Sequence, residues 1–402
     1  MNTLKKLLWV CASAALVASA AEPKKLVLWH AYRAEEKAAL EKVVAAYNKA
    51  NAAKGIEVTT LAVPYDAYPD KITATVPRGK GPDLFIFAQD RMGGWVEAGN
   101  TIEPIDFYLD DATKARFLPS TMEAMTYHGN IYGLPLNYKA ITLIYNKKLV
   151  TTPPKTTGEL VKMAKGLTKG GGYGLAYAYN DFYYHAALMN GFGGRVFDAG
   201  AKPVLNNPQN VKSMELMMKW MDKDKILPLE PSTTLITSLF NEGKAAMVFS
   251  GPWFLGEVKG VDYGLALLPA IDEAGGKPMR PWMTVEGVYV AAPSANKEAA
   301  YDFAKYLTDV ESAKVMALEG RQSPANKAVY SDPKVAADPI LKAFRDQADV
   351  ATPMPNFPEM TMMWSPASTA MNAITKKSAT PKAALDEAQK KVAKDVADLR
   401  KK

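Results

Sequence analysis

The chain has 402 residues, of which 48% are hydrophobic and 23% are charged, with 27 glycines and 27 prolines. This composition is typical of a globular chain and excludes a disordered or fibrous one. At about 100–200 residues per domain, the length predicts two or three domains. The single cysteine, Cys11, excludes an internal disulfide framework and a cysteine-based zinc site, and we expect neither a metal nor a cofactor.

Residues 1–20 have the pattern of an export signal. Two lysines precede an apolar run at 7–17, and 18–20 is a small-residue cleavage site of the sequence Ala-Ser-Ala. We therefore expect cleavage after Ala20. The apolar run is too short to predict a membrane span. Lipidation of Cys11 is an alternative, but the residue lies early in the apolar run and we favour the cleaved signal.

The excess of positive charge is concentrated at the C-terminal end. The formal net charge is +7, and without the two lysines of the export signal it is +5. Residues 376–402 carry nine lysines and arginines and four acids, 9 − 4 = +5, so residues 21–375 are neutral. This pattern predicts a terminal helix with a solvated basic face and not a nucleic-acid-binding groove.

Short apolar runs of strand length alternate with amphipathic stretches of helical period. Residues 35–51, 211–221 and 383–399 each place their apolar side chains on one helical face. The alternation predicts an α/β architecture with mostly parallel sheets. Residues 320–358 contain six prolines, which break regular structure, so we interpret this stretch as a connection between two bodies. The predicted strands are 26–29, 56–63, 84–88, 245–249 and 288–292.

Most enzyme motifs are absent from the sequence. It contains no Walker A loop, no His-Glu-x-x-His, no Gly-x-Ser-x-Gly and no EF-hand pattern. The 42 acidic residues nevertheless allow some catalytic pair of carboxylates. A secreted carbohydrate-active enzyme therefore remains an alternative hypothesis.

Aromatic residues in turn-like contexts are the positive signal for a site. Trp253 follows a predicted strand and the turn 250–252, Trp364 precedes a Ser-Pro pair, and Tyr183 lies just before a helical pattern. Aromatic rings cover the apolar C–H faces of a pyranose, and neighbouring charged groups bind its hydroxyls. Each ring taken alone is more often part of a core, but together they favour a carbohydrate site.

Four motifs occur in a characteristic order along the chain. They are GPDLFIFAQDRMGGW (81–95), LIYNK with PPKT (143–147 and 153–156), FNEGKAAM leading to GPW (240–253), and MPNFPEM (354–360) ahead of Trp364. In this order they resemble the motifs of the maltose- and maltodextrin-binding proteins of ABC importers. The resemblance covers about residue 25 to residue 400.

The resemblance implies a two-lobed α/β periplasmic-binding-protein fold, with crossing segments that form a hinge and a ligand cleft between the lobes. It places the N-lobe at 21–138 plus 287–332 and the C-lobe at 139–286 plus 333–402. The crossings would lie near 136–143, 283–287 and 331–338.

The function that the resemblance implies is transport and not catalysis. We expect a monomeric periplasmic solute-binding protein that captures a di- or oligosaccharide, such as maltose or a maltodextrin, and delivers it to an ABC permease. A binder of an anionic or peptide solute on the same scaffold is the remaining alternative, because a fold does not determine its ligand.

The ligand positions of the family fall on residues of both predicted lobes. Asp90 and Arg91 match sugar-hydroxyl ligands, although a helix N-cap is a competing interpretation of Asp90. Asp181 matches an acidic ligand and equally suits an Asx turn that begins the next helix. The family's stacking aromatics match Tyr183, Trp253 and Trp364.

Several matched positions depart from the family pattern. Arg33 and Lys139 stand where the family has acids, Phe87 replaces a tryptophan, and Ser365 and Ser368 replace a tyrosine and an arginine. This exchange predicts a cleft of partly inverted polarity, and it favours a different oligosaccharide, or one with a carboxylate or sulfate, over maltose itself. The predicted ligand-binding residues are Arg33, Phe87, Asp90, Arg91, Lys139, Asp181, Tyr183, Trp253 and Trp364.

Overall fold

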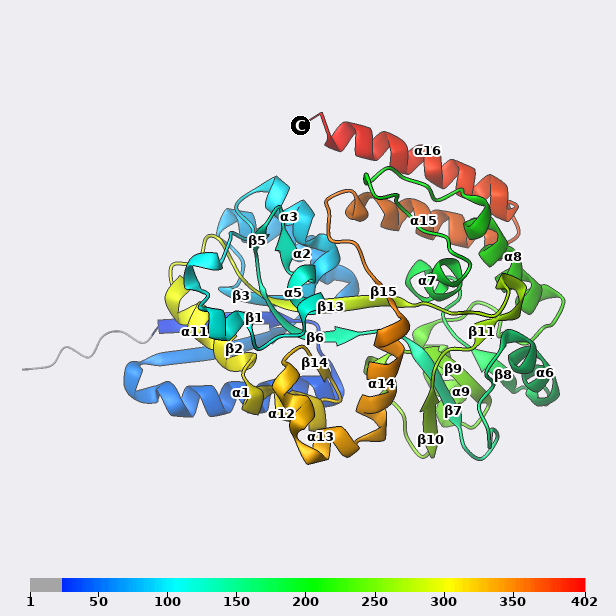
Figure 1. Cartoon of the computed structure of the whole chain (residues 1–402), viewed down its shortest axis with the longest axis horizontal. Coiled ribbons are helices and arrows are strands. Elements are labelled where there is room, and N and C mark those ends of the chain that lie inside the picture. The colour runs from blue at the N-terminus through cyan, green and yellow to red at the C-terminus, as the bar shows by residue number, and fades with distance from the viewer. Residues whose placement is uncertain (1–23, 402) are drawn as a thin grey trace, which may run out of the picture.

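The computed structural model describes residues 24–401, so the predicted export signal at 1–20, with Cys11, lies outside the described residues. Within residues 24–401 the chain forms two lobes, each built around its own sheet (Figure 1). We call the lobe with the seven-stranded sheet the N-lobe and the lobe with the four-stranded sheet the C-lobe. No helix in this part of the chain is long and apolar enough to cross a membrane.

The N-lobe sheet has the strand order β14-β6-β13-β3-β1-β2, and β15 pairs with β13. Strand β1 is parallel to β2 and β3, whereas β13 is antiparallel to β3 and β6. The strands are β1 (Lys24–His30), β2 (Ile56–Ala62), β3 (Leu84–Ala88), β6 (Leu134–Lys139), β13 (Trp282–Val290), β14 (Ser323–Pro324) and β15 (Thr352–Pro353).

The C-lobe sheet has the strand order β10-β7-β9-β8. Strands β8 and β9 are parallel, and β7 is antiparallel to both β9 and β10. The strands are β7 (Thr142–Asn146), β8 (Tyr173–Ala176), β9 (Ala245–Ser250) and β10 (Tyr263–Ala266), and two small hairpins pair β4 (Thr126–Tyr127) with β5 (Asn130–Ile131) and β11 (Ala270–Ile271) with β12 (Lys277–Pro278).

The predicted strands at 26–29, 56–63, 84–88 and 245–249 correspond to β1, β2, β3 and β9, while 288–292 matches only the end of β13. The prediction of mostly parallel sheets is wrong. Parallel pairing arises where a helix returns the chain to the same end of the sheet. Strand β13 instead comes directly from the C-lobe, and it runs opposite to its neighbours β3 and β6.

Helices cover both sheets (Figure 1). The N-lobe contains α1 (Ala34–Asn51), α2 (Tyr68–Thr75), α3 (Met92–Ala98), α4 (Asp111–Lys114), α5 (Pro119–Ala124), α11 (Lys297–Leu307) and α12 (Val310–Leu318), with the 3₁₀ turns η2 (Tyr65–Ala67), η4 (Gln89–Arg91) and η7 (Lys327–Ser331). The C-lobe contains α6 (Thr157–Leu167), α7 (Phe182–Gly191), α8 (Pro208–Asp222), α9 (Thr233–Asn241) and α10 (Pro252–Leu255).

Two long helices, α15 (Met360–Thr375) and α16 (Pro381–Leu399), pack against each other and against α8 of the C-lobe (Figure 1). The prediction of an apolar stripe on the terminal helix is confirmed, because Ala384, Leu385, Ala388, Val392 and Val396 are buried in α16. Its lysines are exposed, which accounts for the basic end of the chain.

The proline-rich stretch 320–358 contains more regular structure than the sequence predicts. Pro333 and Pro339 lie in the first turns of α13 (Pro333–Ala337) and α14 (Pro339–Val350). Proline is favourable at the start of a helix, where its missing N–H is not needed. These two prolines therefore begin helices instead of breaking them.

Three connections join the lobes (Figure 1). Strand β6 leads into β7 through the buried residues Ala140 and Ile141, and β13 starts beside β15 and then enters the N-lobe sheet. The third connection extends beyond the predicted stretch 331–338: α13 still packs on α12 and η7, and α14 contacts both β14 and β7. Two parts of the predicted C-lobe segment 333–402 thus lie against the N-lobe, α13 and the loop around Asn356, whose carbonyl accepts the Gly93 N–H at 2.9 Å.

Candidate functional site

The loops that follow β1, β2 and β3 lie at one edge of the N-lobe sheet, because the carboxyl ends of parallel strands share an edge. Arg33 follows β1, Tyr65 and Asp66 follow β2, and Asp90 and Arg91 follow β3. A small pocket lined by residues of both lobes opens beside Arg33 and includes Trp253 of the C-lobe. We call the space that these loops border the interlobe cleft.

Asp90 and Trp364 connect the N-lobe to the helix α15. Trp364 Nε1 donates a hydrogen bond to Asp90 Oδ2 at 3.0 Å, and Arg91 Nε lies 3.2 Å from the same oxygen. Asp90 is buried, and desolvation raises its pKa, although Arg91 and the Trp364 hydrogen bond partly offset this. The structure brings these three predicted site residues together, and Asp90 caps no helix with its side chain.

Three predicted aromatic residues line the C-lobe side of the site, with Trp282 between them. The ring centroids of Trp253 and Tyr183 are 6.1 Å apart, those of Tyr183 and Trp282 are 6.3 Å apart, and those of Trp282 and Trp364 are 5.6 Å apart. Trp282 is buried, whereas the other three are half-buried and pack one side against the core. The three predicted rings therefore pack against the core and keep part of their surface accessible.

Trp253 is held in a defined orientation. Its ring lies on the backbone of Gly251, where a Cβ atom would come within 2.3 Å of the ring, and its Nε1 donates to the Tyr184 hydroxyl at 3.2 Å. Any side chain at position 251 would displace the ring. The glycine of the GPW motif thus sets the direction in which the tryptophan points.

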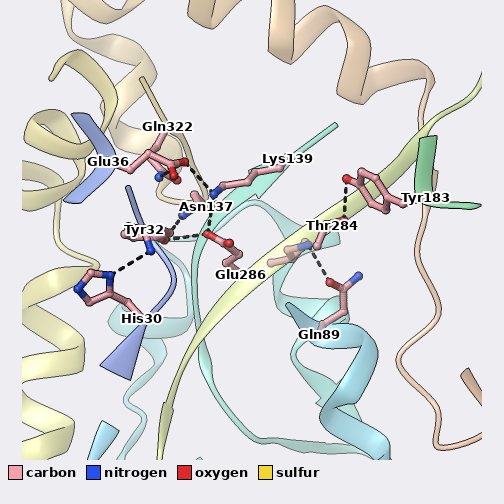
Figure 2. A network of polar contacts seen from close by, with 11 residues as sticks. His30, Tyr32, Glu36, Gln89, Asn137, Lys139, Tyr183, Thr284, Glu286 and Gln322 are labelled. Atoms are coloured by element: carbon pink, nitrogen blue, oxygen red, sulfur yellow. Dashed lines mark hydrogen bonds and ion pairs between the residues drawn. The ribbon is translucent and has the colours of Figure 1, made fainter. Parts of the chain in front are cut away.

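Asp181 and Tyr183 begin helix α7. Asp181 Oδ1 accepts the Tyr183 N–H at 2.9 Å, so the prediction of an Asx turn that begins the next helix is confirmed. The residue is nevertheless exposed, while desolvation raises its pKa and the charge of Asp66 from the N-lobe adds to the effect. A carboxylate at the rim of a cleft is open to solvent on one side and desolvated by neighbouring protein on the other, which accounts for both observations. The Tyr183 hydroxyl lies 3.2 Å from Thr284 Oγ1 on β13 (Figure 2).

Lys139 lies in a network of buried polar groups at the hinge (Figure 2). Its Nζ is 2.9 Å from Glu36 Oε1 and 3.1 Å from Glu286 Oε2. Desolvation lowers the Lys139 pKa, but the two carboxylates outweigh it and raise the pKa overall. Desolvation raises the pKa of Glu36, with Lys139 partly offsetting the effect. The lysine predicted as a ligand residue is thus neutralised by two glutamates.

The network extends to neutral side chains on both sides of the lysine (Figure 2). Gln322 Nε2 donates to Glu36 at 2.8 Å, and the Tyr32 hydroxyl donates to Glu286 at 2.7 Å. Asn137 in turn donates to the Tyr32 hydroxyl at 2.8 Å. Because α1, β6, β13 and the segment before β14 each contribute a residue, the network ties together the elements at the base of the cleft.

Arg33 is also paired with an acid. Its Nη1 lies 3.0 Å from Glu257 Oε1, which follows α10 in the C-lobe. Arg33 itself is exposed. Arg33 and Lys139, the two bases at positions where the resembled family has acids, thus each have a carboxylate partner within the chain. These partners compensate the positive charge that the sequence predicted for the cleft.

Phe87 does not border the cleft, in contrast to the prediction. It is 3% exposed, because the Tyr65 ring stacks on it at 5.6 Å with an interplanar angle of 16°. Tyr68 and Trp95 pack edge-on against Phe87. The exposed ring at this place is that of Tyr65, which sequence reasoning missed. Its position directly after a predicted strand at the sheet edge was the available signal.

Sequence reasoning also missed the three carboxylates that pair with Arg33 and Lys139, which are Glu36, Glu257 and Glu286. No local motif marks them, because each pairs with a base that is distant in the sequence. Among residues 24–401, no group of three or more His, Cys, Asp or Glu side chains is placed to hold a metal ion.

Known proteins share both the sequence pattern and the fold. Residues 30–314 match the family described as bacterial extracellular solute-binding protein. A maltotriose-binding protein of Pyrococcus abyssi (strain GE5 / Orsay) is 33% identical over 387 residues, which are 92% of this chain and 82% of the relative. A galactooligosaccharide-binding protein of Bacillus subtilis (strain 168) is 29% identical over 94% of both chains.

Among solved structures, the maltotriose-binding protein of Thermus thermophilus bound with maltotriose superposes with a TM-score of 0.85 at 27% identity. The match covers 92% of this chain and 100% of that one. The family match and the similarity to these relatives extend over most of the chain. The protein belongs to the bacterial extracellular solute-binding protein family.

Proposed function

We propose that this protein is a periplasmic solute-binding protein that captures a neutral di- or oligosaccharide and delivers it to an ABC transporter. It would be exported by the signal at residues 1–20, with cleavage near Ala20, and it would bind its solute without chemical change. The relatives support a sugar of the maltodextrin or galactooligosaccharide type, since they are named as binding maltotriose and galactooligosaccharides.

The contact between Asp90 and Trp364 carries this proposal. It joins an ionisable group of the N-lobe to an indole ring on α15, next to the half-buried rings of Tyr183 and Trp253. A carboxylate with an adjacent guanidinium binds sugar hydroxyls strongly and directionally, while aromatic faces cover the apolar side of the sugar ring. Both kinds of group would contact a solute held between the lobes.

The charges around the cleft favour a neutral solute over an anionic one. Arg33 and Lys139 are already paired with carboxylates, so neither offers an unpaired positive charge. The acids also outnumber the bases, which disfavours a carboxylate or sulfate group on the ligand. The acids are Glu35, Glu36, Asp66, Asp90, Asp181, Glu257 and Glu286, and the bases are Arg33, Arg91, Lys139 and Arg321.

The two-lobed structure supports a capture mechanism by closure. A solute shifts the equilibrium between open and closed lobes only by its difference in affinity for the two states, so it must contact both lobes. Specificity would arise from hydrogen bonds, because a sugar of the wrong shape forms fewer of them with the polar groups that closure removes from water.

Titration calorimetry with the purified protein tests the proposal. We expect maltotriose or a galactooligosaccharide to bind, and an oligosaccharide of uronic acids to bind at least tenfold more weakly. A bound ligand at about 100 times its Kd stabilises the folded state by about 2.7 kcal/mol, so the melting temperature should rise. Binding of the acidic sugar in preference to every neutral one would contradict the charge argument.

The competing hypothesis of a carbohydrate-active enzyme is tested with the same sugars. Incubation of the protein with each oligosaccharide, followed by chromatography, should return the sugar unchanged. New reducing ends that form in proportion to protein concentration would support the enzyme. A raised melting temperature without product supports the binding protein.

A further inference from the structure

Four aromatic rings form a stack at the N-lobe edge of the cleft, and Tyr65 is its outer member. Tyr65 is stacked on Phe87, and Phe87 is supported edge-on by Tyr68 at 5.4 Å and Trp95 at 5.8 Å. Tyr68 and Trp95 are buried. The plane of the Tyr65 ring is therefore fixed from beneath, although the residue itself is 58% exposed.

Groups of both lobes act electrostatically on the hydroxyl of Tyr65. Burial of the hydroxyl raises the pKa of Tyr65, and the charges of Asp90 and Glu286 together with the Tyr183 hydroxyl raise it further. Tyr183 belongs to α7 of the C-lobe, whereas Tyr65 belongs to the N-lobe. Tyr65 follows β2 at the same edge of the sheet at which Asp90 and Arg91 follow β3, so it lies on the cleft side of the N-lobe.

Tyr183 belongs to the row of aromatic rings in the C-lobe, with its ring centroid 6.1 Å from that of Trp253. A pyranose presents apolar C–H patches on its faces, and an aromatic ring that is held rigid binds such a patch at little entropic cost. We propose that Tyr65 is the N-lobe ring that stacks on the sugar and selects solutes with a flat apolar face. It would do so in place of Phe87, which it covers. This inference rests on the proposed function.

The assignment has a consequence for closure. A sugar that stacks only on the C-lobe rings would contact one lobe and could not favour the closed state. Tyr65 supplies an apolar contact from the other lobe, next to the polar contact of Asp90. Its loss should therefore weaken binding even though the C-lobe rings remain in place.

Calorimetry with maltotriose on single variants tests the proposal. Tyr65→Ala should raise the Kd at least tenfold, and Tyr65→Phe, which keeps the ring, should bind within about threefold of the wild type. Phe107→Ala is the matched control, because it removes a ring that is 94% exposed and has no part in the cleft. The melting temperatures of all three variants should stay near that of the wild type.

A second measurement does not depend on a variant. Hydroxyl-radical footprinting reports the exposure of aromatic rings, and maltotriose should protect Tyr65 from oxidation while leaving Phe107 unprotected. The lobes already contact each other in this structure while Tyr65 remains exposed, so protection requires a ligand on the ring.

The outcomes separate this inference from the proposed function. Wild-type binding that survives Tyr65→Ala, or an equal loss in Tyr65→Phe and Tyr65→Ala, would overturn the stacking role of Tyr65 alone. Absence of protection of Tyr65 by bound maltotriose would do the same. A wild-type protein that binds no oligosaccharide would overturn the proposed function and this inference with it.

Discussion

Arg33 and Glu257 form an ion pair that joins the two lobes, with Arg33 Nη1 3.0 Å from Glu257 Oε1. A Cβ atom on the neighbouring Gly256 would lie 3.4 Å from the Cβ of Ala34, so the backbones of the lobes are close at this point. The pair requires that the lobes meet. It therefore stabilises the closed arrangement without any contact to a solute.

Removal of this ion pair should weaken ligand binding modestly. Arg33→Ala and Glu257→Ala should each raise the Kd for maltotriose about 1.5- to 5-fold, since an ion pair at an exposed site contributes about 0.2–1 kcal/mol. The effect should decrease at high ionic strength because salt screens exposed charges. Calorimetry at two salt concentrations measures both.

Lys42→Ala provides the matched control for the ion pair. Lys42 pairs with Glu319 within the N-lobe, so this variant loses an exposed ion pair but no contact between lobes, and its Kd should not change. A loss of about a hundredfold in Arg33→Ala that Glu257→Ala does not share would contradict the interlobe role. Such a result would instead support the prediction that Arg33 binds the sugar directly.

The hinge network should be important for stability. Lys139→Met leaves Glu36 and Glu286 without their cation in a largely buried site. Loss of one partner from a buried ion pair typically costs about 3–5 kcal/mol in the free energy of unfolding. Urea denaturation at neutral pH measures this difference.

Lys147→Met is the control for the hinge variant. Lys147 pairs with Asp262 at an exposed site, so the urea midpoint should be unchanged. In addition, Glu36→Gln in the Lys139→Met background should restore part of the lost stability, because it removes one of the two unpaired charges. Equal midpoints for Lys139→Met and Lys147→Met would contradict the stabilising role of the network.

The sequence was sufficient to predict the elements with a strong local pattern. Strands β1, β3 and β9 each contain an apolar run of at least four residues, and α16 has a regular apolar stripe, so each was found close to its true position. The order of the motifs predicted two lobes and brought Asp90, Arg91 and Trp364 into one site. These residues lie in motifs whose local sequence is distinctive.

Long-range partners could not be predicted in the same way. Glu36 and Glu286 are separated by 250 positions, and only the pairing of β6 with β13 brings Glu286 next to Lys139. The covering of Phe87 by Tyr65 likewise depends on how the loop after β2 folds over the end of β3. The sequence therefore identified Arg33 and Lys139 but not the carboxylates that neutralise them.

Acidification should destabilise the protein through two buried histidines. Burial lowers the pKa of His30 from 6.5 to about 4 and that of His185 to about 3. Between these values and 6.5, the unfolded chain binds more protons than the folded one, so stability falls as the pH falls. Below those pKa values the full cost is about 3 kcal/mol for His30 and about 5 kcal/mol for His185.

Urea denaturation of the wild type and His185→Gln from pH 7 to pH 4 checks this prediction. The variant should lose less stability than the wild type over this range, and His128→Gln, which changes an exposed histidine, should follow the wild type. The raised pKa values of Glu36 and Asp90 change the stability in the opposite direction, but they do so in the wild type and in the variant alike. The difference between the two proteins therefore isolates the effect of His185. Parallel pH profiles for all three proteins would contradict it.

The two half-buried tryptophans of the cleft should differ in behaviour from a core tryptophan. Trp220 is fully buried in α8, and Trp220→Ala should cost about 3–5 kcal/mol of stability. Trp253→Ala and Trp364→Ala should instead lower the affinity for maltotriose by at least tenfold with a smaller loss of stability. Denaturation and calorimetry on the three variants separate the two effects.

Trp364→Phe then distinguishes the ring from its N–H group. The phenylalanine ring keeps an aromatic face but cannot donate to Asp90 Oδ2, which would retain Arg91 as its charged neighbour. If the ring stacks on the sugar, Trp364→Phe should bind more tightly than Trp364→Ala. If the two variants bind equally weakly, the hydrogen bond that orients Asp90 is the main contribution of Trp364, and the stacking role of this residue is wrong.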